Sequence, residues 1–428
     1  MRFGRDVDAK NPTELTAGRD TLALILAGGN GTRLGELTRR ECKPAIAFAG
    51  HFRNIDFTLS NCVNSGVRRI GVLTQYKAQT LITHIAGGWS FLPRPLGEFV
   101  EVWPAQQRLH SAWYAGTADA VYQNLDLVLA QRTRYTLVLA GDHIYKMDYR
   151  PLIEQHVRSG AEATLACVPV PVEDASSFGV LGVDAQQRVQ SFIEKPSPGS
   201  LRAAEQRTVL ASMGVYVFTT EYLADSLRRD AVNADSAHDF GRNILPAAVR
   251  EDRVGAYAFT DGKAGAGYWR DVGTLDAYWQ AHMELLVPVP PIELFDPAWP
   301  IFTLAEPLPP ARVMVDAAHE GSVANSLLGG GVVIRGARVS NSVLSANVQI
   351  AAGSTLSEAV ILPNVRIGSH CSLRRVIVEA GMHIPDGTVI GPACTPQAGA
   401  QRPDRVTLLA RECGTVPDGA ADELRSVA

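Results

Sequence analysis

The sequence lacks the features that mark secreted, zinc-binding and membrane proteins. Its six cysteines have no paired spacing, which argues against a disulfide framework and a zinc site. The first twenty residues have no apolar centre, and no later apolar run approaches the roughly 18 residues of a membrane span. We therefore expect a cytoplasmic protein with ordinary, mostly buried thiols at Cys42, Cys62, Cys167, Cys371, Cys394 and Cys413.

A strong charge excess is also absent. Forty basic and 44 acidic residues leave a net charge of −4, and the pI is near 6.2. The summed field of such a chain gives no reason to expect nucleic acid or an anionic membrane as a partner. The anions that this protein binds are expected to be small molecules.

The first two thirds of the chain alternate short β-rich runs with amphipathic helical segments. This alternation predicts an α/β domain with a Rossmann-like, doubly wound, mostly parallel sheet covered by helices on both faces. The predicted strands are Leu22–Ala27, Arg69–Thr74, Tyr135–Ala140, Ala163–Val168, Val189–Ile193 and Gly214–Phe218. The predicted helices include Asp119–Leu129 and Pro151–Ser159.

The pattern changes near residue 288, where eight prolines within 23 residues predict a stiff, extended linker. Beyond it, apolar residues recur every six positions with a slip of one between series. This period predicts a left-handed parallel β-helix. His370 and His383 within it are expected to lie on the surface. The predicted parts are an arm (1–20), the α/β domain (21–287), the linker (288–310) and the β-helix domain (311–428). Hexapeptide coils are used for acyl transfer and for oligomerisation, so the repeat alone specifies no function.

A glycine-rich turn follows the first predicted strand and predicts a phosphate loop. Gly28, Gly29, Gly31 and Thr32 lie in this turn, and glycines let several backbone N–H groups face one anion. A tight turn after a buried strand is the plain alternative for the glycines alone. Arg33, and Lys43 ten residues later, add two cations suited to a polyphosphate.

Two aspartates are candidate ligands for a hard cation. Asp142 directly follows a predicted buried strand, at the sheet edge where ligands of such folds bind. Asp271 lies among aromatic residues before a Gly-Thr turn. Mg²⁺ takes one or two carboxylates together with phosphate oxygens and water. A helix cap or turn for Asp142, and a salt bridge or cap for Asp271, remain alternatives.

A second phosphate and a nucleobase have candidate partners elsewhere. Pro196 ends a strand at Lys195, which places an ammonium at a loop mouth, although a loop lysine is usually only solvated. Trp113 and Tyr114, followed by Gly116 and a helix start, offer aromatic faces and a close backbone approach, although such pairs more often pack. Together the set predicts nucleotidyl transfer, in which the protein positions the reactants and stabilises charge.

These stretches resemble a known family. The run from Ala27 to Leu34 with Lys43-Pro44 is similar to the sugar-1-phosphate nucleotidyltransferase superfamily. Further motifs resemble its bacterial glucose-1-phosphate adenylyltransferase family, and they cover nearly the whole chain: 52–57, 59–62, 104–108, 113–120, 139–145, 177–180, 211–218, 238–241 and 268–274.

The resemblance implies a homotetramer that makes ADP-glucose and pyrophosphate from ATP and glucose 1-phosphate with Mg²⁺, for glycogen synthesis. It implies that Arg33, Lys43 and Asp142 are catalytic and that Asp142 and Asp271 hold the metal. The implied nucleotide-binding residues are Gly28, Gly29, Gly31, Thr32, Gln75 and Gly116. The implied glucose-1-phosphate residues are Tyr114, Gly179, Glu194, Lys195 and Ser212.

The resemblance also implies control by small metabolites between the two domains, with Gln75 and Trp113 relaying the signal. Family members activated by sugar bisphosphates carry Lys-Arg where this chain has Arg40-Glu41, and Ala130 replaces a basic residue of their AMP site. Because an acid at position 41 would repel a phosphate, we expect a smaller anionic effector such as fructose 6-phosphate or pyruvate. Its candidate binding residues are Arg40, Arg53, Arg402 and Arg405.

Two other interpretations stay open at this point. One is a sister enzyme that uses another base or sugar, or is fused to an acyltransferase. The other is a regulatory subunit that kept the fold and lost the chemistry. Such subunits typically lose Arg33, Asp142 or Lys195, and this chain has all three.

Overall fold

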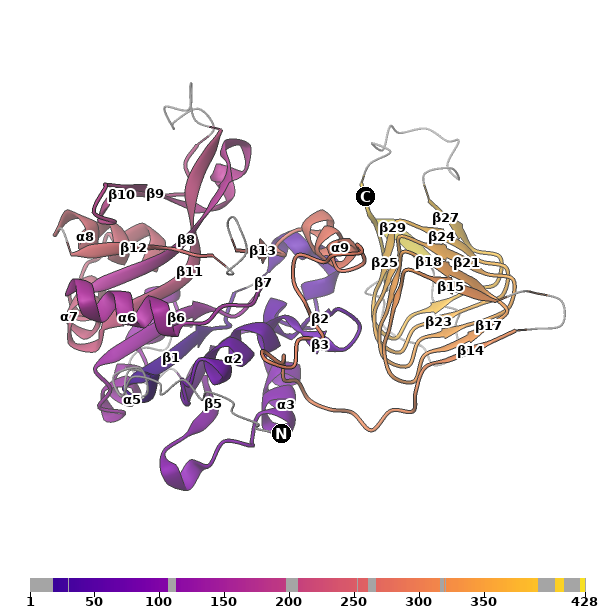
Figure 1. Cartoon of the computed structure of the whole chain (residues 1–428), viewed down its shortest axis with the longest axis horizontal. Coiled ribbons are helices and arrows are strands. Elements are labelled where there is room, and N and C mark those ends of the chain that lie inside the picture. The colour runs from indigo at the N-terminus through magenta and orange to yellow at the C-terminus, as the bar shows by residue number, and fades with distance from the viewer. Residues whose placement is uncertain are drawn as a thin grey trace, which may run out of the picture.

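The structure is a computed structural model that describes residues 18–29, 31–106, 113–197, 207–251, 253–260, 267–315, 319, 321–391, 405–411 and 424–427. The side chains of Thr32 and residues 424–427 are outside this description. Two domains lie side by side, an α/β domain and a β-helix, and one extended segment connects them (Figure 1). The expected fold class is confirmed.

Four parallel strands form one half of the main sheet. They lie in the order β6-β1-β4-β5, and they are β6 (Tyr135–Ala140), β1 (Thr21–Leu26), β4 (Arg69–Thr74) and β5 (Phe99–Pro104). Leu22, Leu24 and Ile25 of β1 are fully buried on both faces of the sheet. This explains why β1 is a continuous apolar run without polar alternation.

The other half of the sheet is mixed. Strand β11 (Thr208–Thr219) runs antiparallel to β6 and pairs on its other side with β8 (Ala163–Pro171) and β9 (Gly179–Val183). Beyond these lie β10 (Val189–Glu194), antiparallel to β9, and β12 (Val254–Ala258), parallel to β8. The expected strands were correctly located, and β8 and β11 extend beyond their predicted ends.

The helices pack on the sheet, and one prediction about them was wrong. The expected single helix Asp119–Leu129 is two short helices, α4 and α5, with Gln123 and Asn124 between them. Asn124 donates from Nδ2 to the Ala120 carbonyl and to the Tyr114 hydroxyl, and this competition for backbone acceptors disfavours a continuous helix. The helices are α2 (Asn54–Asn64), α3 (Gln79–Gly88), α4 (Thr117–Tyr122), α5 (Leu125–Ala130), α6 (Arg150–Ser159), α7 (Thr220–Ala231), α8 (Leu245–Arg250) and α9 (Leu275–Glu284).

The second domain is a coil of three parallel sheets. In one sheet Ile350 pairs with Ile367, and Ile367 pairs with Ile384, so each coil takes 17 residues. A triangular coil with three sides of six residues each has this length when one residue is missing from it. The missing residue explains why the six-residue apolar period slips by one. His370 and His383 are exposed, as expected.

The strands of the three sheets are short. The first sheet holds β14 (Arg312–Met314), β17 (Val333–Arg335), β20 (Gln349–Ile350), β23 (Arg366–Ile367) and β26 (His383–Ile384). The second holds β15 (Ser322–Ala324), β18 (Arg338–Ser340), β21 (Thr355–Ser357), β24 (Ser372–Arg374) and β27 (Val389–Ile390). The third holds β16 (Leu327–Leu328), β19 (Val343–Leu344), β22 (Val360–Ile361), β25 (Val376–Val378), β28 (Thr407–Arg411) and β29 (Leu424–Val427).

A shared apolar core joins the two domains. Helix α9 and the hairpin of β2 (Ala47–Phe48) and β3 (Phe52–Arg53) face the β-helix (Figure 1). Trp279 of α9 donates its indole N–H to the Glu358 carbonyl at 2.7 Å, and Arg375 lies 4.5 Å from the centre of the Trp279 ring system. Buried residues of both domains meet there: Ile46, Phe48, Phe57, Tyr278, Val360, Ile377, Val406 and Leu408. The domains are therefore packed together and not merely tethered.

The linker has no helix or strand between residues 285 and 311, as its prolines predict. It is fixed to α2 by side-chain hydrogen bonds. Trp299 donates to Asn61 at 3.1 Å, and the Phe302 N–H donates to the Ser60 hydroxyl at 2.8 Å. Across the described residues, no helix has the length and hydrophobicity needed to cross a membrane.

Candidate active site

The ends of three neighbouring parallel strands bring predicted site residues together. Gly28 follows β1, Asp142 follows β6 on one side of it, and Gln75 follows β4 on the other. Gly28 lies so close to Gln75 that a Cβ at position 28 would be 3.3 Å from the Gln75 Cβ. These positions lie at the carboxyl edge of the sheet, where open α/β sheets bind ligands.

Lys43 lies between the two predicted metal ligands. Its Nζ is 2.9 Å from Asp142 Oδ2 and 2.6 Å from Asp271 Oδ1, and its side chain is 8 % exposed. Asp271 reaches the site on β13 (Trp269–Asp271), which pairs with β7 (His143–Tyr145) and places Asp271 opposite His143. Residues 228 positions apart therefore form one charge cluster.

The charges of this cluster reinforce one another. Burial by itself would raise the pKa of the Asp142 carboxyl, but the charge of Lys43, together with His143 and the hydrogen bonds to the carboxylate, outweighs burial and lowers that pKa to about 2. The pKa of Asp271 is lowered for the same reason. Burial would lower the pKa of Lys43, yet the two carboxylates raise it. Both acids are thus charged at neutral pH and available as ligands.

The predicted phosphate loop ends beside this cluster. Gly31 has a left-handed backbone (φ 59°) at the start of the 3₁₀ helix Thr32–Thr38, and the Thr38 hydroxyl donates to the Gly31 carbonyl at 2.9 Å. The guanidinium of Arg33 lies 3.6 Å from Asp271 and is half-exposed. Arg33, Phe178, Trp269 and Asp271 are among the residues that line a cavity of about 360 Å³. Arg33 is therefore free to turn toward an anion in that cavity.

The expected sugar-phosphate residues gather around the end of β10. A Cβ on Gly179 would lie 2.9 Å from the Glu194 carboxylate, so glycine makes room for that acid. Burial raises the pKa of the Glu194 carboxyl. Lys195 has a left-handed backbone (φ 46°), its N–H donates to the Phe178 carbonyl, and its half-exposed ammonium is 3.6 Å from Glu194. Lys195 is therefore held at the rim with its charge facing outward.

Ser212 and Tyr114 are each fixed by a hydrogen bond of their own hydroxyl group. The Ser212 and Tyr216 hydroxyls are 3.0 Å apart, and both residues lie on β11. The Tyr114 hydroxyl accepts from Asn124 at 2.9 Å, and burial raises the pKa of Tyr114. Trp113 is 48 % exposed and lies against Tyr76, with 5.5 Å between ring centres. Trp113 and Tyr114 are thus partly accessible to a ligand.

Gly116 is a close-packing position at the start of α4. The His238 carbonyl accepts hydrogen bonds from the Ala118 and Asp119 N–H groups, and a Cβ at Gly116 would lie 2.2 Å from that carbonyl oxygen. The Asp239 carboxylate accepts from the Thr117 hydroxyl at 2.8 Å. The segment around His238 therefore positions the loop that carries Trp113 and Tyr114.

Gly116→Ala should destabilise the protein by about 1–3 kcal/mol, because the added methyl group would overlap backbone atoms that cannot move independently. Chemical denaturation followed by circular dichroism measures the change. Gly29→Ala is the matched control, since no atom lies within 4 Å of its Cβ position. Equal stability of the two variants would contradict the packing role of Gly116.

Two residues at the site were not singled out from the sequence. His143 Nε2 lies 3.7 Å from Asp142 and 4.0 Å from Asp271. Asp239 lies near enough to Glu194 to raise its pKa. The position of His143 directly after Asp142 was the available signal, whereas nothing local in the sequence indicated the approach of Asp239 to Glu194.

The donor set of the cluster fits a divalent cation. Ligand atoms of Asp142, His143 and Asp271 all lie within 4.8 Å of one another, and all three residues are partly exposed. Carboxylate oxygens suit Mg²⁺, and the partial exposure leaves room for phosphate oxygens and water.

Of the four predicted effector arginines, three lie within the described residues. Arg402 lies outside the described residues, and Arg405 and Arg40 are exposed. Arg53 lies 3.6 Å from Glu41, and burial raises the pKa of the Glu41 carboxyl. The Glu41 carboxylate thus lies beside Arg53, where a phosphate group would otherwise bind.

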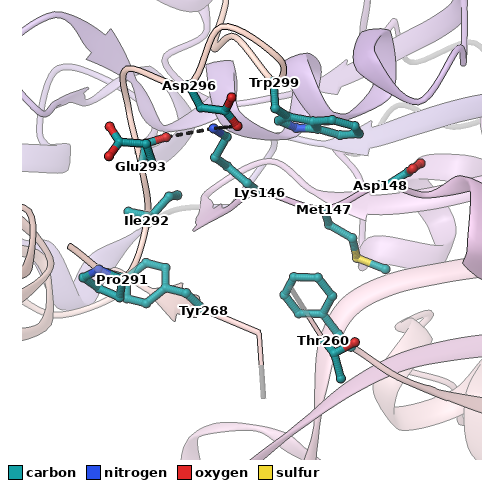
Figure 2. Close-up of a pocket in the computed structure, with 11 residues that line it drawn as sticks. Lys146, Met147, Asp148, Thr260, Tyr268, Pro291, Ile292, Glu293, Asp296 and Trp299 are labelled. Carbon is teal, nitrogen blue, oxygen red and sulfur yellow. Dashed lines mark hydrogen bonds and ion pairs between the residues drawn. The ribbon is translucent and has the colours of Figure 1, made fainter. Parts of the chain in front are cut away.

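A second cavity, of about 410 Å³, is lined by other residues than those of the charge cluster (Figure 2). It is bounded by residues after β7, by the end of β12 and by the linker. Lys146 crosses it and donates to the Glu293 carbonyl at 2.8 Å, and it lies 3.3 Å from Asp296 (Figure 2). The lysine of this cavity therefore anchors the linker to the strand segment that carries His143.

Comparison with known proteins identifies both domains. Residues 22–287 match the family described as nucleotidyl transferase, and residues 309–402 match the GlmU-like C-terminal hexapeptide repeats. Curated relatives include three bacterial proteins named glucose-1-phosphate adenylyltransferase. The protein of Methylobacillus flagellatus is 52 % identical over 88 % of this chain and 89 % of its own. That of Paraburkholderia phytofirmans is 48 % identical over 92 % and 96 %. That of Shewanella amazonensis is 52 % identical over 87 % and 89 %.

These matches agree with the cluster of Lys43, Asp142 and Asp271 at the carboxyl edge of the sheet. The chain is an enzyme of the nucleotidyltransferase class, and it belongs to the glucose-1-phosphate adenylyltransferase family.

Proposed function

We propose that this enzyme transfers the adenylyl group of ATP to α-D-glucose 1-phosphate, giving ADP-glucose and pyrophosphate. The observation that carries the proposal is the placement of Lys43 and Arg33 around Asp142 and Asp271, beside the phosphate loop. Two cations there can stabilise the charge of a leaving pyrophosphate. The names of the relatives support the two substrates.

We propose Mg²⁺ as the cofactor, held by Asp142 and Asp271. When bound, the ion would neutralise charge on the α-phosphate and orient it for in-line attack. The sugar phosphate would lie at the end of β10, with Lys195 against its phosphate and Glu194, Tyr114, Gly179 and Ser212 around its sugar. A phosphate dianion is already nucleophilic, so positioning replaces a side-chain base.

A pyrophosphorolysis assay across nucleotide sugars tests the substrates. ADP-glucose should give the highest kcat/KM. A higher value for UDP-glucose or GDP-glucose would replace the proposal with a sister activity. No reaction with any nucleotide sugar, in a folded protein, would favour a regulatory subunit.

We also propose that the enzyme acts in glycogen synthesis in the bacterial cytoplasm under the control of a small anionic metabolite. Arg39 reaches across the domain boundary to the Arg411 carbonyl at 3.5 Å, and Arg53 is paired with Glu41 next to it. Arg40 lies between Arg39 and Glu41 in the sequence, and its side chain is exposed. An anion bound at Arg40 could therefore act on Lys43, three residues away.

Arg40→Ala should raise the concentration of fructose 6-phosphate or pyruvate needed for half-maximal activation at least about tenfold. This is the change expected for loss of one charge-assisted contact. The measurement is the effector concentration that gives half-maximal activation. Arg335→Ala, which removes an exposed arginine of the β-helix, is the control. Unchanged activation in Arg40→Ala would exclude this site.

A homotetramer is the proposed assembly. Val289 and Phe295 in the linker are 82 % and 80 % exposed, and a subunit contact would bury such large apolar side chains. Light scattering coupled to size exclusion gives the mass directly, and a monomer would contradict the proposal.

A further inference from the structure

His143 has one ring nitrogen whose role is settled by geometry. Its Nδ1 lies 3.1 Å from the Met213 carbonyl oxygen, and a carbonyl can only accept a hydrogen bond. Nδ1 therefore carries a proton. In the neutral imidazole, Nε2 is then an unprotonated electron-pair donor.

The surroundings fix the direction in which Nε2 points. The ring meets Trp269 edge to face, with 5.0 Å between centres and an angle of 83°. Gly214 lies on another side, where a Cβ would be 3.4 Å from the His143 Cε1. Held in this way, Nε2 faces Asp142 at 3.7 Å and Asp271 at 4.0 Å, and both distances are longer than a hydrogen bond.

In the neutral form of His143, the Nε2 lone pair faces the two carboxylates, so a divalent cation placed among the three side chains would meet three ligand atoms. The spacing leaves room for one, because ligand atoms about 2.1 Å from a common ion lie about 3–4 Å apart. Metal-binding histidines commonly donate their other N–H to a backbone carbonyl, as His143 does to Met213.

We propose that His143 is a third protein ligand of the divalent cation, through Nε2, beside Asp142 and Asp271. The inference rests on the proposed metal site and extends it. A site with one nitrogen and two carboxylate donors prefers Co²⁺ and Mn²⁺ over Mg²⁺ more strongly than a site with oxygen donors alone. The reason is that imidazole favours transition metals. His143 is therefore a determinant of metal preference.

Lys43 sets the conditions of the experiment. Its ammonium lies against the same carboxylates, so it and a divalent cation repel each other there. Phosphate groups that bind to Lys43 would compensate its positive charge and so weaken that repulsion. The probe is therefore Mn²⁺ together with inorganic triphosphate, which has phosphates but no nitrogen.

Electron spin echo spectroscopy of the full-length protein with this probe should show the ¹⁴N coupling of a directly bound imidazole. His143→Gln should abolish the coupling and weaken Mn²⁺ binding at least about tenfold. Competition by Mg²⁺ should become more effective in that variant. His383→Gln, which removes an exposed histidine of the β-helix, should change neither result.

The outcomes separate the two proposals. If Asp142→Asn weakens Mn²⁺ binding but the unmodified protein shows no ¹⁴N coupling, the metal site stands and His143 is not a ligand. If Asp142→Asn leaves Mn²⁺ binding unchanged, the metal site itself fails and His143 has no cation to bind. The spectrum of the unmodified protein decides the first point without any variant.

Discussion

Asp142→Asn should lower kcat by about 100-fold or more, with a modest change in KM. The amide keeps the shape of the side chain but removes the charge that lies 2.9 Å from Lys43. It also removes a proposed metal ligand. Both losses act where charge develops in the transition state, so kcat should fall more than substrate affinity. Steady-state kinetics with both substrates varied measures the two constants.

Asp225→Asn is the matched control for this variant. Asp225 is 70 % exposed on α7 and pairs with Arg228 at the surface. Its replacement should leave kcat unchanged, since exposed ion pairs contribute little. An unchanged kcat in Asp142→Asn would remove Asp142 from the mechanism.

Lys195→Gln should raise the KM for glucose 1-phosphate by about 10- to 100-fold, which corresponds to one lost charge-assisted hydrogen bond to phosphate. The KM for ATP should change little, because Lys195 lies at the end of β10 and the phosphate loop follows β1. Product inhibition by ADP-glucose should weaken in parallel.

Arg188→Gln removes a cation at the opposite end of β10 and should leave both KM values unchanged. If Lys195→Gln instead weakens ATP and spares glucose 1-phosphate, the two phosphate assignments are exchanged. Such a result would still leave the nucleotidyltransferase class intact.

Local sequence patterns predicted the fold class and several of its strands and helices. The apolar run at β1 and the glycines after it located the first strand and the turn that follows it, because burial on both faces and a tight turn each leave a mark within a few residues. The six-residue period with its slip located the β-helix, since each side of a coil buries one residue per six. The split between α4 and α5 was missed because the Asn124 side chain, which no periodicity records, competes for the backbone acceptor.

The composition of the active site was decided by the tertiary structure. The sequence itself determined that Asp142 follows a strand and that Lys43 follows the glycine-rich turn after β1. That Lys43 meets both Asp142 and Asp271, and that Nε2 of His143 faces the same two carboxylates, depends on the pairing of β13 with β7 and of β6 with β1. Contacts between residues far apart in the chain follow from strand order and register, and these are set by packing of the whole sheet, not by any local pattern.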